Sequence, residues 1–103
     1  MPSYLTLATL LDGPLHGYAI MRRAAELSDG AVRPSTGTLY ALLERAIAEG
    51  LVVAGEPYRE GGRKRRDYTL TDDGRRELQA ETLRLQRAAR TVARRLRATA
   101  VAQ

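Results

Sequence analysis

Residues 35–50 read STGTLYALLERAIAEG, and this stretch decides the fold. Ser35 is a preferred residue for a helix N-cap, and Gly50 is a preferred residue just beyond a helix end. The apolar residues between them recur at the spacing of one helix face, at Leu39, Leu42, Leu43, Ala46 and Ile47. The stretch therefore predicts a helix over residues 36–49 whose first turn is polar and uncharged.

Two further helices are predicted before this one, over residues 4–12 and 15–27, with Gly13-Pro14 as the break between them. Leucine and alanine cover most of the circumference of the first helix, whereas a surface helix needs only one apolar stripe. We therefore expect the first helix to be covered on two sides. Val32 and Arg33 are expected to form a very short strand before Pro34.

The segment after the helix of residues 36–49 has the pattern of a β-hairpin. Residues 51–57 and 65–71 are predicted strands, and residues 58–64, which include Gly61-Gly62, are the predicted turn. Five Lys and Arg against two acidic residues give residues 58–71 a net charge of +3, so this hairpin has a basic tip.

A long final helix is predicted from Asp72 to about residue 99, with a cap and first-turn carboxylates from Thr71-Asp72-Asp73. Such a helix spans ~42 Å, which is longer than a head of this size needs for cover. Its seam recurs with alternating steps of four and three residues, at Leu78, Thr82, Leu85, Ala89, Val92, Leu96 and Thr99. This pattern predicts pairing with a second copy of the chain.

Charge and composition point to a polyanionic partner and exclude several classes of protein. The net charge is +5, and its excess lies in residues 58–71 and in residues 72–103, which carry +4. The chain has no Cys and a single His, His16, which excludes disulfide frameworks, thiol nucleophiles, Cys-based metal sites and multi-His sites. We expect no enzyme activity, no cofactor and no metal.

No run approaches the ~20 apolar residues of a membrane span, and the N-terminus lacks the basic leader of a signal peptide. A cytoplasmic protein without membrane contact is expected.

The order of elements, three helices, a basic hairpin and a long helix, is that of a winged helix-turn-helix, a mainly α fold with a small β-hairpin. A helix N-terminus offers free N–H groups to phosphate, and hydroxyl groups can bond phosphates or base edges. Cations on a flexible hairpin suit a sugar–phosphate backbone. The candidate DNA-binding residues are Tyr18, Ser35, Thr36, Gly37, Thr38, Tyr40, Arg63, Lys64, Arg65 and Arg66.

Four blocks together resemble the PadR family of bacterial transcriptional regulators. They are LHGYAI (15–20), STGTLY (35–40), EGLV (49–52) and RRDYTLTDDG (65–74), and the resemblance covers residues 4–97. It implies a homodimeric repressor, often released by a small-molecule effector. Two copies of the helix of residues 36–49 in successive major grooves of double-stranded DNA then predict a pseudo-palindromic operator. It also implies that Tyr18 and Tyr40 lie at the DNA.

The same resemblance implies a DNA-binding domain over residues 1–71 and a dimerisation helix over residues 72–103 that packs against the first helix of the partner. The candidate dimerisation residues are Leu5, Leu10, Leu78, Leu85, Val92 and Leu96. The chain departs from the family pattern at Ala41, where Pro is common, and it contains no Trp for an aromatic drug pocket.

Two other functions stay open from the sequence. One is an interaction module that uses the winged-helix fold to bind a protein in place of DNA, and the other is a ligand sensor whose DNA role is secondary. His16, next to Gly17 at a helix start, is expected to make a structural hydrogen bond.

Overall fold

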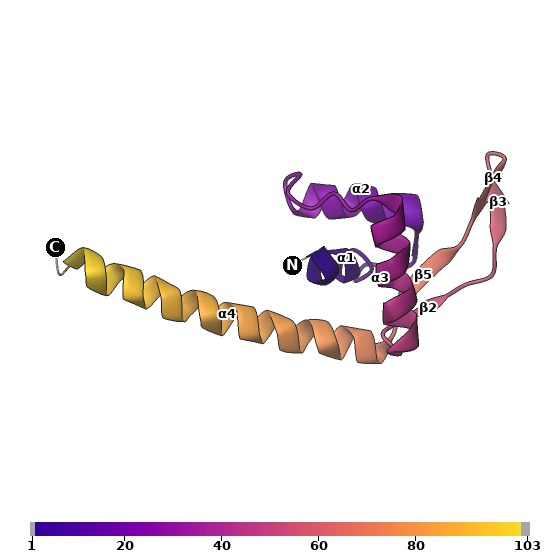
Figure 1. Ribbon diagram of the computed structural model, residues 1–103. Coiled ribbons are helices and arrows are strands. Elements are labelled where there is room, and N and C mark those ends of the chain that lie inside the picture. Colours follow the sequence, from indigo (N-terminus) through magenta and orange to yellow (C-terminus); the bar gives the residue numbers. More distant parts are fainter. Residues whose placement is uncertain (1, 102–103) are drawn as a thin grey trace.

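The computed structural model describes residues 2–101, so Met1, Ala102 and Gln103, at the ends of the two predicted segments 1–71 and 72–103, lie outside the described residues. Three helices and a small sheet form a head, residues 2–71, from which one long helix projects (Figure 1). The elements in chain order are α1 (Pro2–Ala8), β1 (Leu15–His16), α2 (Gly17–Leu27), α3 (Thr36–Ala48), β2 (Val52–Ala54), β3 (Tyr58–Glu60), β4 (Arg63–Arg65), β5 (Asp67–Leu70) and α4 (Asp72–Val101).

The core lies where α1, α2 and α3 meet strands β2 and β5 and the start of α4. Ile20 and Leu39 are fully buried, and Leu43 and Val52 are 1% exposed. Leu39 and Leu43 belong to the apolar positions that the sequence placed on one face of a helix, and α3 forms over nearly the predicted residues. Burial of such side chains stabilises the fold by about 1.5–3 kcal/mol each relative to an exposed position. The helix-turn-helix is therefore held by ordinary apolar packing.

The helix α1 is shorter than the predicted span of residues 4–12. After Ala8 the backbone continues in tight turns, because the amides of residues 9–11 donate to the carbonyl three residues back. The hydroxyl of Thr9 donates to the carbonyl oxygen of Thr6 at 2.6 Å, which competes with the next helical hydrogen bond.

The second helix begins at Gly17, not at Leu15 as predicted. Leu15 and His16 instead pair with β5 at one edge of an antiparallel sheet of order β1-β5-β2. The expected strand at Val32-Arg33 is wrong, because those residues lie in an irregular segment where the hydroxyl of Ser28 accepts the amide of Val32.

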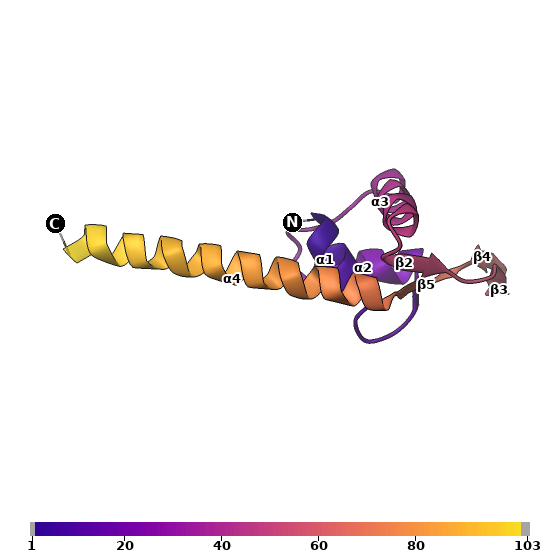
Figure 2. The same cartoon turned by 90° about the horizontal axis from the view of Figure 1, so that it is seen from below.

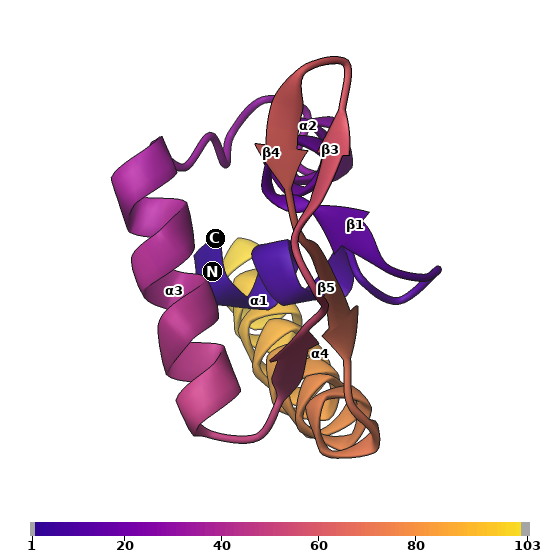
Figure 3. The same cartoon turned by 90° about the vertical axis from the view of Figure 1, so that its right-hand side faces the viewer.

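The predicted hairpin is present but consists of two separate ladders (Figure 3). We call the outer ladder, residues 58–65, the wing. The predicted turn over residues 58–64 is wrong in extent, since only Gly61 and Gly62 lie in the turn and both have positive φ. The register of the outer ladder is Tyr58↔Arg65, Arg59↔Lys64 and Glu60↔Arg63, and that of the inner one is Val52↔Leu70, Val53↔Thr69 and Ala54↔Tyr68.

The final helix α4 has 30 residues and gives the molecule extents of 62 × 27 × 22 Å. Its hydroxyl cap is as predicted, because Thr71 Oγ1 accepts the amide of Gly74 at 3.0 Å. A Cβ on Gly74 would overlap the carbonyl oxygen of Leu51, so glycine is required where α4 passes this close to the end of α3. Only the first turns of α4 touch the head, and the rest extends past it (Figures 1 and 2).

Candidate nucleic-acid interface

The first turn of α3 presents a polar, uncharged surface to solvent. Ser35, Thr36, Gly37 and Thr38 are all exposed. The hydroxyl of Ser35 caps the helix by accepting the amide of Thr38 at 3.2 Å, and it donates to Thr38 Oγ1 at 3.0 Å. Within residues 2–101 the Thr38 hydroxyl donates to no acceptor, so its proton is available to a ligand. No atom would lie within 4 Å of a Cβ on Gly37, so a ligand can approach this part of the backbone closely.

The phenol of Tyr40 lies against the start of α2. A Cβ on Gly17 would overlap the Tyr40 hydroxyl and come within 3.0 Å of its Cζ, so only glycine leaves room for this contact. Tyr40 is 41% exposed and Tyr18 is 53% exposed, so both phenols also face solvent. The guanidinium of Arg22 lies 5.6 Å from the centroid of the Tyr18 ring, a cation–π distance.

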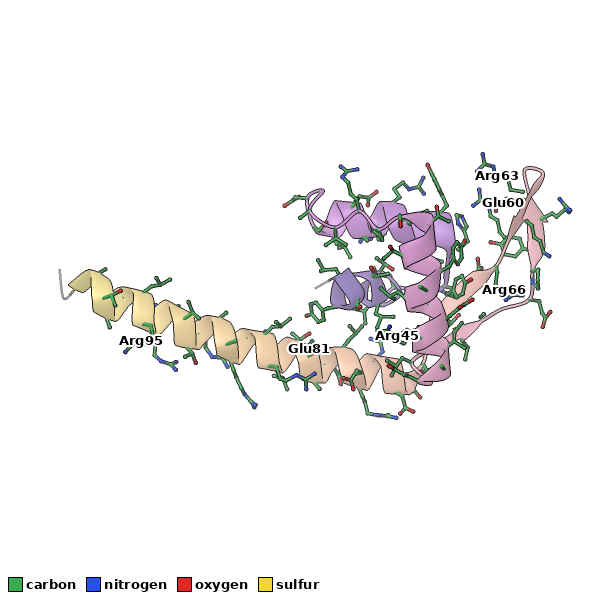
Figure 4. All side chains as sticks on the ribbon, in the orientation of Figure 1. Arg45, Glu60, Arg63, Arg66, Glu81 and Arg95 are labelled. Carbon is green, nitrogen blue, oxygen red and sulfur yellow. The ribbon has the colours of Figure 1, made fainter. Side chains whose placement is uncertain are left out.

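The four cations of residues 63–66, at the wing and just after it, divide into two kinds. Arg63, Lys64 and Arg66 are exposed. Arg65 differs, since its side chain is 19% exposed and its guanidinium contacts groups of the chain itself. Figure 4 shows Glu60 and Arg63 together near the wing tip, far from Arg95 on the distal part of α4.

A shallow recess of about 330 Å³ joins the start of α2, α3 and the wing. Its lining includes Tyr18, Tyr40, Arg63 and Arg66. The N-terminus of α3 and the wing tip point to the same side of the head, away from the start of α4 (Figures 1 and 3). Six of the ten candidate DNA-binding residues thus lie on the recess, and the Ser35–Thr38 turn lies on the same side of the head.

One hydrogen bond that supports the wing was not among the sequence predictions. Tyr58 donates to Asp67 Oδ1 at 2.7 Å. This hydrogen bond to the Asp67 carboxylate, more than burial, raises the pKa of Tyr58. Burial raises the pKa of Tyr68, which packs in the core below the wing. A Tyr and an Asp nine residues apart give no pattern that a sequence alone would show.

The predicted dimerisation residues fall into two groups. Leu10 and Leu78 are 3% and 6% exposed and belong to the core of the single chain, and Leu5 and Leu85 are half-buried. Val92 and Leu96 are 56% and 64% exposed on the part of α4 beyond the head. A hydrogen bond of 2.5 Å between the hydroxyls of Tyr4 and Thr82 ties α1 to the start of α4. The apolar seam is therefore covered by the head at one end and open at the other.

Within residues 2–101, no group of three or more His, Cys, Asp or Glu side chains could hold a metal ion. No helix in that part of the chain is long and apolar enough to cross a membrane.

The family profile described as "Transcriptional regulator PadR-like family" matches residues 6–80, which span the head and the start of α4. The chain belongs to this family. The family consists of transcription regulators and not of enzymes, in agreement with the expectation from the sequence.

A curated protein shows how far the sequence similarity extends. A protein in transposon TN4556 of Streptomyces fradiae is 43% identical over 77 residues, which are 75% of this chain and 21% of that protein. The chain thus spans about a fifth of the length of that relative.

Two solved PadR structures have the same fold. The PadR family regulator from Eggerthella lenta is 29% identical with a TM-score of 0.74, over 91% of this chain and 80% of that one. Bacillus subtilis PadR, solved in complex with operator DNA, is 27% identical with a TM-score of 0.68, over 78% of this chain and 46% of that one. The predicted winged helix-turn-helix with a long C-terminal helix is confirmed.

Proposed function

We propose that this PadR-like chain is a homodimeric, sequence-specific DNA-binding repressor. Each protomer places the N-terminal turn of α3 in the major groove and its wing on the adjacent sugar–phosphate backbone. The observation that carries the proposal is the common direction of two surfaces, the exposed Ser35–Thr38 turn and the exposed cations of the wing (Figures 1 and 3).

The chemistry of the turn fits the edge of a DNA groove. Free backbone N–H groups and the positive end of the α3 dipole favour phosphate. The exposed hydroxyls of Thr36 and Thr38 can donate to base edges or phosphate oxygens. Tyr18 and Tyr40 add phenol donors beside the wing. Base contacts from the turn then give specificity, whereas the wing and tyrosine contacts give most of the affinity.

The charge pattern of α4 favours an antiparallel dimer. Residues 72–86 carry four acidic residues and three Arg, whereas residues 87–101 carry five Arg and no acidic residue. In a parallel dimer, the five Arg of residues 87–101 would lie beside the same five Arg of the other copy. In an antiparallel dimer they lie beside Glu77 and Glu81 of the other copy. Figure 4 shows Glu81 and Arg95 well separated along α4, as this arrangement requires.

A two-fold dimer of winged heads implies a two-fold operator. Two copies of α3 in successive major grooves lie about 34–36 Å apart, which corresponds to one turn of B-DNA between half-site centres. A pseudo-palindrome follows from this symmetry, and a protein that covers such a site can block transcription there. Release by a small-molecule effector, which the family resemblance implies, stays a prediction.

Gly37→Ala tests the close approach of α3 to DNA. A Cβ at residue 37 lies within 4 Å of no described atom, and alanine has a higher helix propensity than glycine. The free energy of unfolding should therefore rise by about 0.5–1 kcal/mol. The added methyl group should nevertheless weaken binding to a duplex from the chain's own upstream region by about tenfold, because it separates backbone from DNA. Thermal unfolding and fluorescence anisotropy measure the two effects.

Gly50→Ala provides a contrast, because Gly50 has a φ of +77° at the far end of α3. It should lower stability and leave the affinity of the folded protein unchanged. Unaltered DNA affinity of Gly37→Ala would contradict the assigned approach, and binding of a protein partner without duplex binding would favour the interaction-module alternative.

A further inference from the structure

The wing is joined to the rest of the sheet through a break in the ladder. The amide of Gly55 donates to the carbonyl of Asp67 at 2.8 Å, and the next paired residues are Tyr58 and Arg65. Residues 56–57 thus stand opposite the single residue Arg66, which is the count of a β-bulge. Pro57 has no N–H to add to the ladder. The backbone alone therefore fixes the wing weakly, and side chains must set its direction.

Arg65 reaches from the wing to the helix-turn-helix. Its Nη1 lies 3.1 Å from Nδ1 of His16, at the start of α2, and the two residues are 49 positions apart in the chain. Its Nε lies 3.4 Å from Glu60 Oε1 on the paired strand, an ion-pair contact. The Arg65 side chain is only 19% exposed and its guanidinium lies between these two groups, whereas Arg63, Lys64 and Arg66 are exposed.

The contacts of His16 determine which of its nitrogens carries the proton. Nδ1 accepts the amide of Ala19 at 3.2 Å as the N-cap of α2, which confirms the structural hydrogen bond expected for His16. An amide and a guanidinium can only donate, so Nδ1 accepts from both and the ring proton lies on Nε2. The Nδ1 atom of His16 thus accepts one hydrogen bond from the first turn of α2 and one from the wing.

We propose that Arg65 and His16 form a latch that fixes the wing against the start of α2, so that Arg65 is a positioning residue and not a phosphate ligand. The inference rests on the proposed DNA-binding function and refines it. Phosphate contact then falls to Arg63, Lys64 and Arg66. A wing held in place before binding loses less conformational freedom on the DNA, and this raises affinity without any new contact.

A double-mutant cycle on DNA affinity separates positioning from contact. Arg65→Met and His16→Ala should each weaken binding to the upstream duplex by about tenfold or more. The double variant should bind no more weakly than His16→Ala alone, because either change already opens the latch. Arg63→Met is the matched control, since Arg63 lies two residues away on the same strand face and is exposed. The fold decrease in DNA affinity caused by Arg63→Met should multiply with the fold decrease caused by His16→Ala when the two are combined.

His16→Asn keeps the latch while removing the imidazole. The Oδ1 of Asn occupies the position of Nδ1, accepts two hydrogen bonds and is a preferred N-cap. This variant should bind DNA within about threefold of the natural chain, and Arg65→Met should still cost about tenfold in its background. The proposal is overturned if the affinity losses of Arg65→Met and His16→Ala multiply in the double variant. It is also overturned if the His16→Asn variant is folded but does not bind DNA as well as the natural chain.

A measurement without DNA distinguishes failure of the latch from failure of the proposed function. The chain contains a single His, so its imidazole ¹⁵N resonances are assigned without ambiguity. Arg65→Met should shift the Nδ1 resonance of His16, and Arg63→Met should leave it unchanged. An Nδ1 resonance that does not respond to Arg65→Met would overturn the latch whether or not the protein binds DNA.

Discussion

Val92→Asp is expected to convert the protein to monomers and to weaken operator binding by more than about 100-fold. Val92 is 56% exposed on the part of α4 beyond the head, so the aspartate is solvated in the monomer and the head stays folded. In the dimer the seam buries the carboxylate without a partner, which costs about 3–5 kcal/mol for each unpaired charge. A monomer offers one head to a two-fold site and forfeits the contacts of the second.

Thr91→Asp is the matched control for this result. It adds the same charge one residue earlier, at an exposed position outside the seam. It should leave both the dimer mass and the DNA affinity unchanged. Sedimentation equilibrium measures the mass, and an unchanged dimer for Val92→Asp would show that α4 does not form the interface through this seam.

Joint replacement of Arg63 and Lys64 by Gln should remove much of the electrostatic affinity. A dimer that neutralises roughly 6–8 phosphates gives a slope of log K against log salt of about −5 to −7. The double variant removes four cations from the dimer, so the slope should become shallower by about 2–4 and affinity near 0.1 M salt should fall by about 100-fold or more. All duplex sequences should be affected alike, because phosphates carry no sequence information.

Arg87→Gln with Arg94→Gln provides the control for the loss of charge. These two Arg are exposed on the distal part of α4 and lie away from its apolar seam, so the same number of charges is removed far from the wing. The salt slope should stay within about 0.5 of the natural value. If the Arg87/Arg94 variant changed the salt slope as much as the Arg63/Lys64 variant, net charge and not the wing would govern binding.

The helices could be predicted because their signals are local. Ser35 and Gly50 mark the two ends of α3, and Leu39 and Leu43 mark its buried face, so cap, period and packing agree. The hydroxyl of Thr71 likewise marks the start of α4. The start of α2 was misplaced by two residues because Leu15 and His16 pair with β5, more than 50 residues later, and no local pattern shows that pairing.

The candidate interface was predictable in composition but not in the division of roles within it. Strand alternation predicts that only about half of the side chains of Arg63–Arg66 face the DNA, but it does not show which residue contacts the chain itself. The structure places Arg65 against His16 and leaves the other three exposed. The bulge at residues 56–57 changes which side chains of the hairpin share a face. It arises because two residues of one strand stand opposite one residue of the other, and no sequence pattern shows this.

The most direct test of the central claim is selection of bound DNA from a pool of random duplexes, followed by hydroxyl-radical footprinting of the selected site. A two-fold dimer of winged heads should select a pseudo-palindrome with two protected half-sites whose centres lie about 34–36 Å apart, or one helical turn. Enrichment of no sequence, or protection of one isolated half-site by the dimer, would contradict the claim.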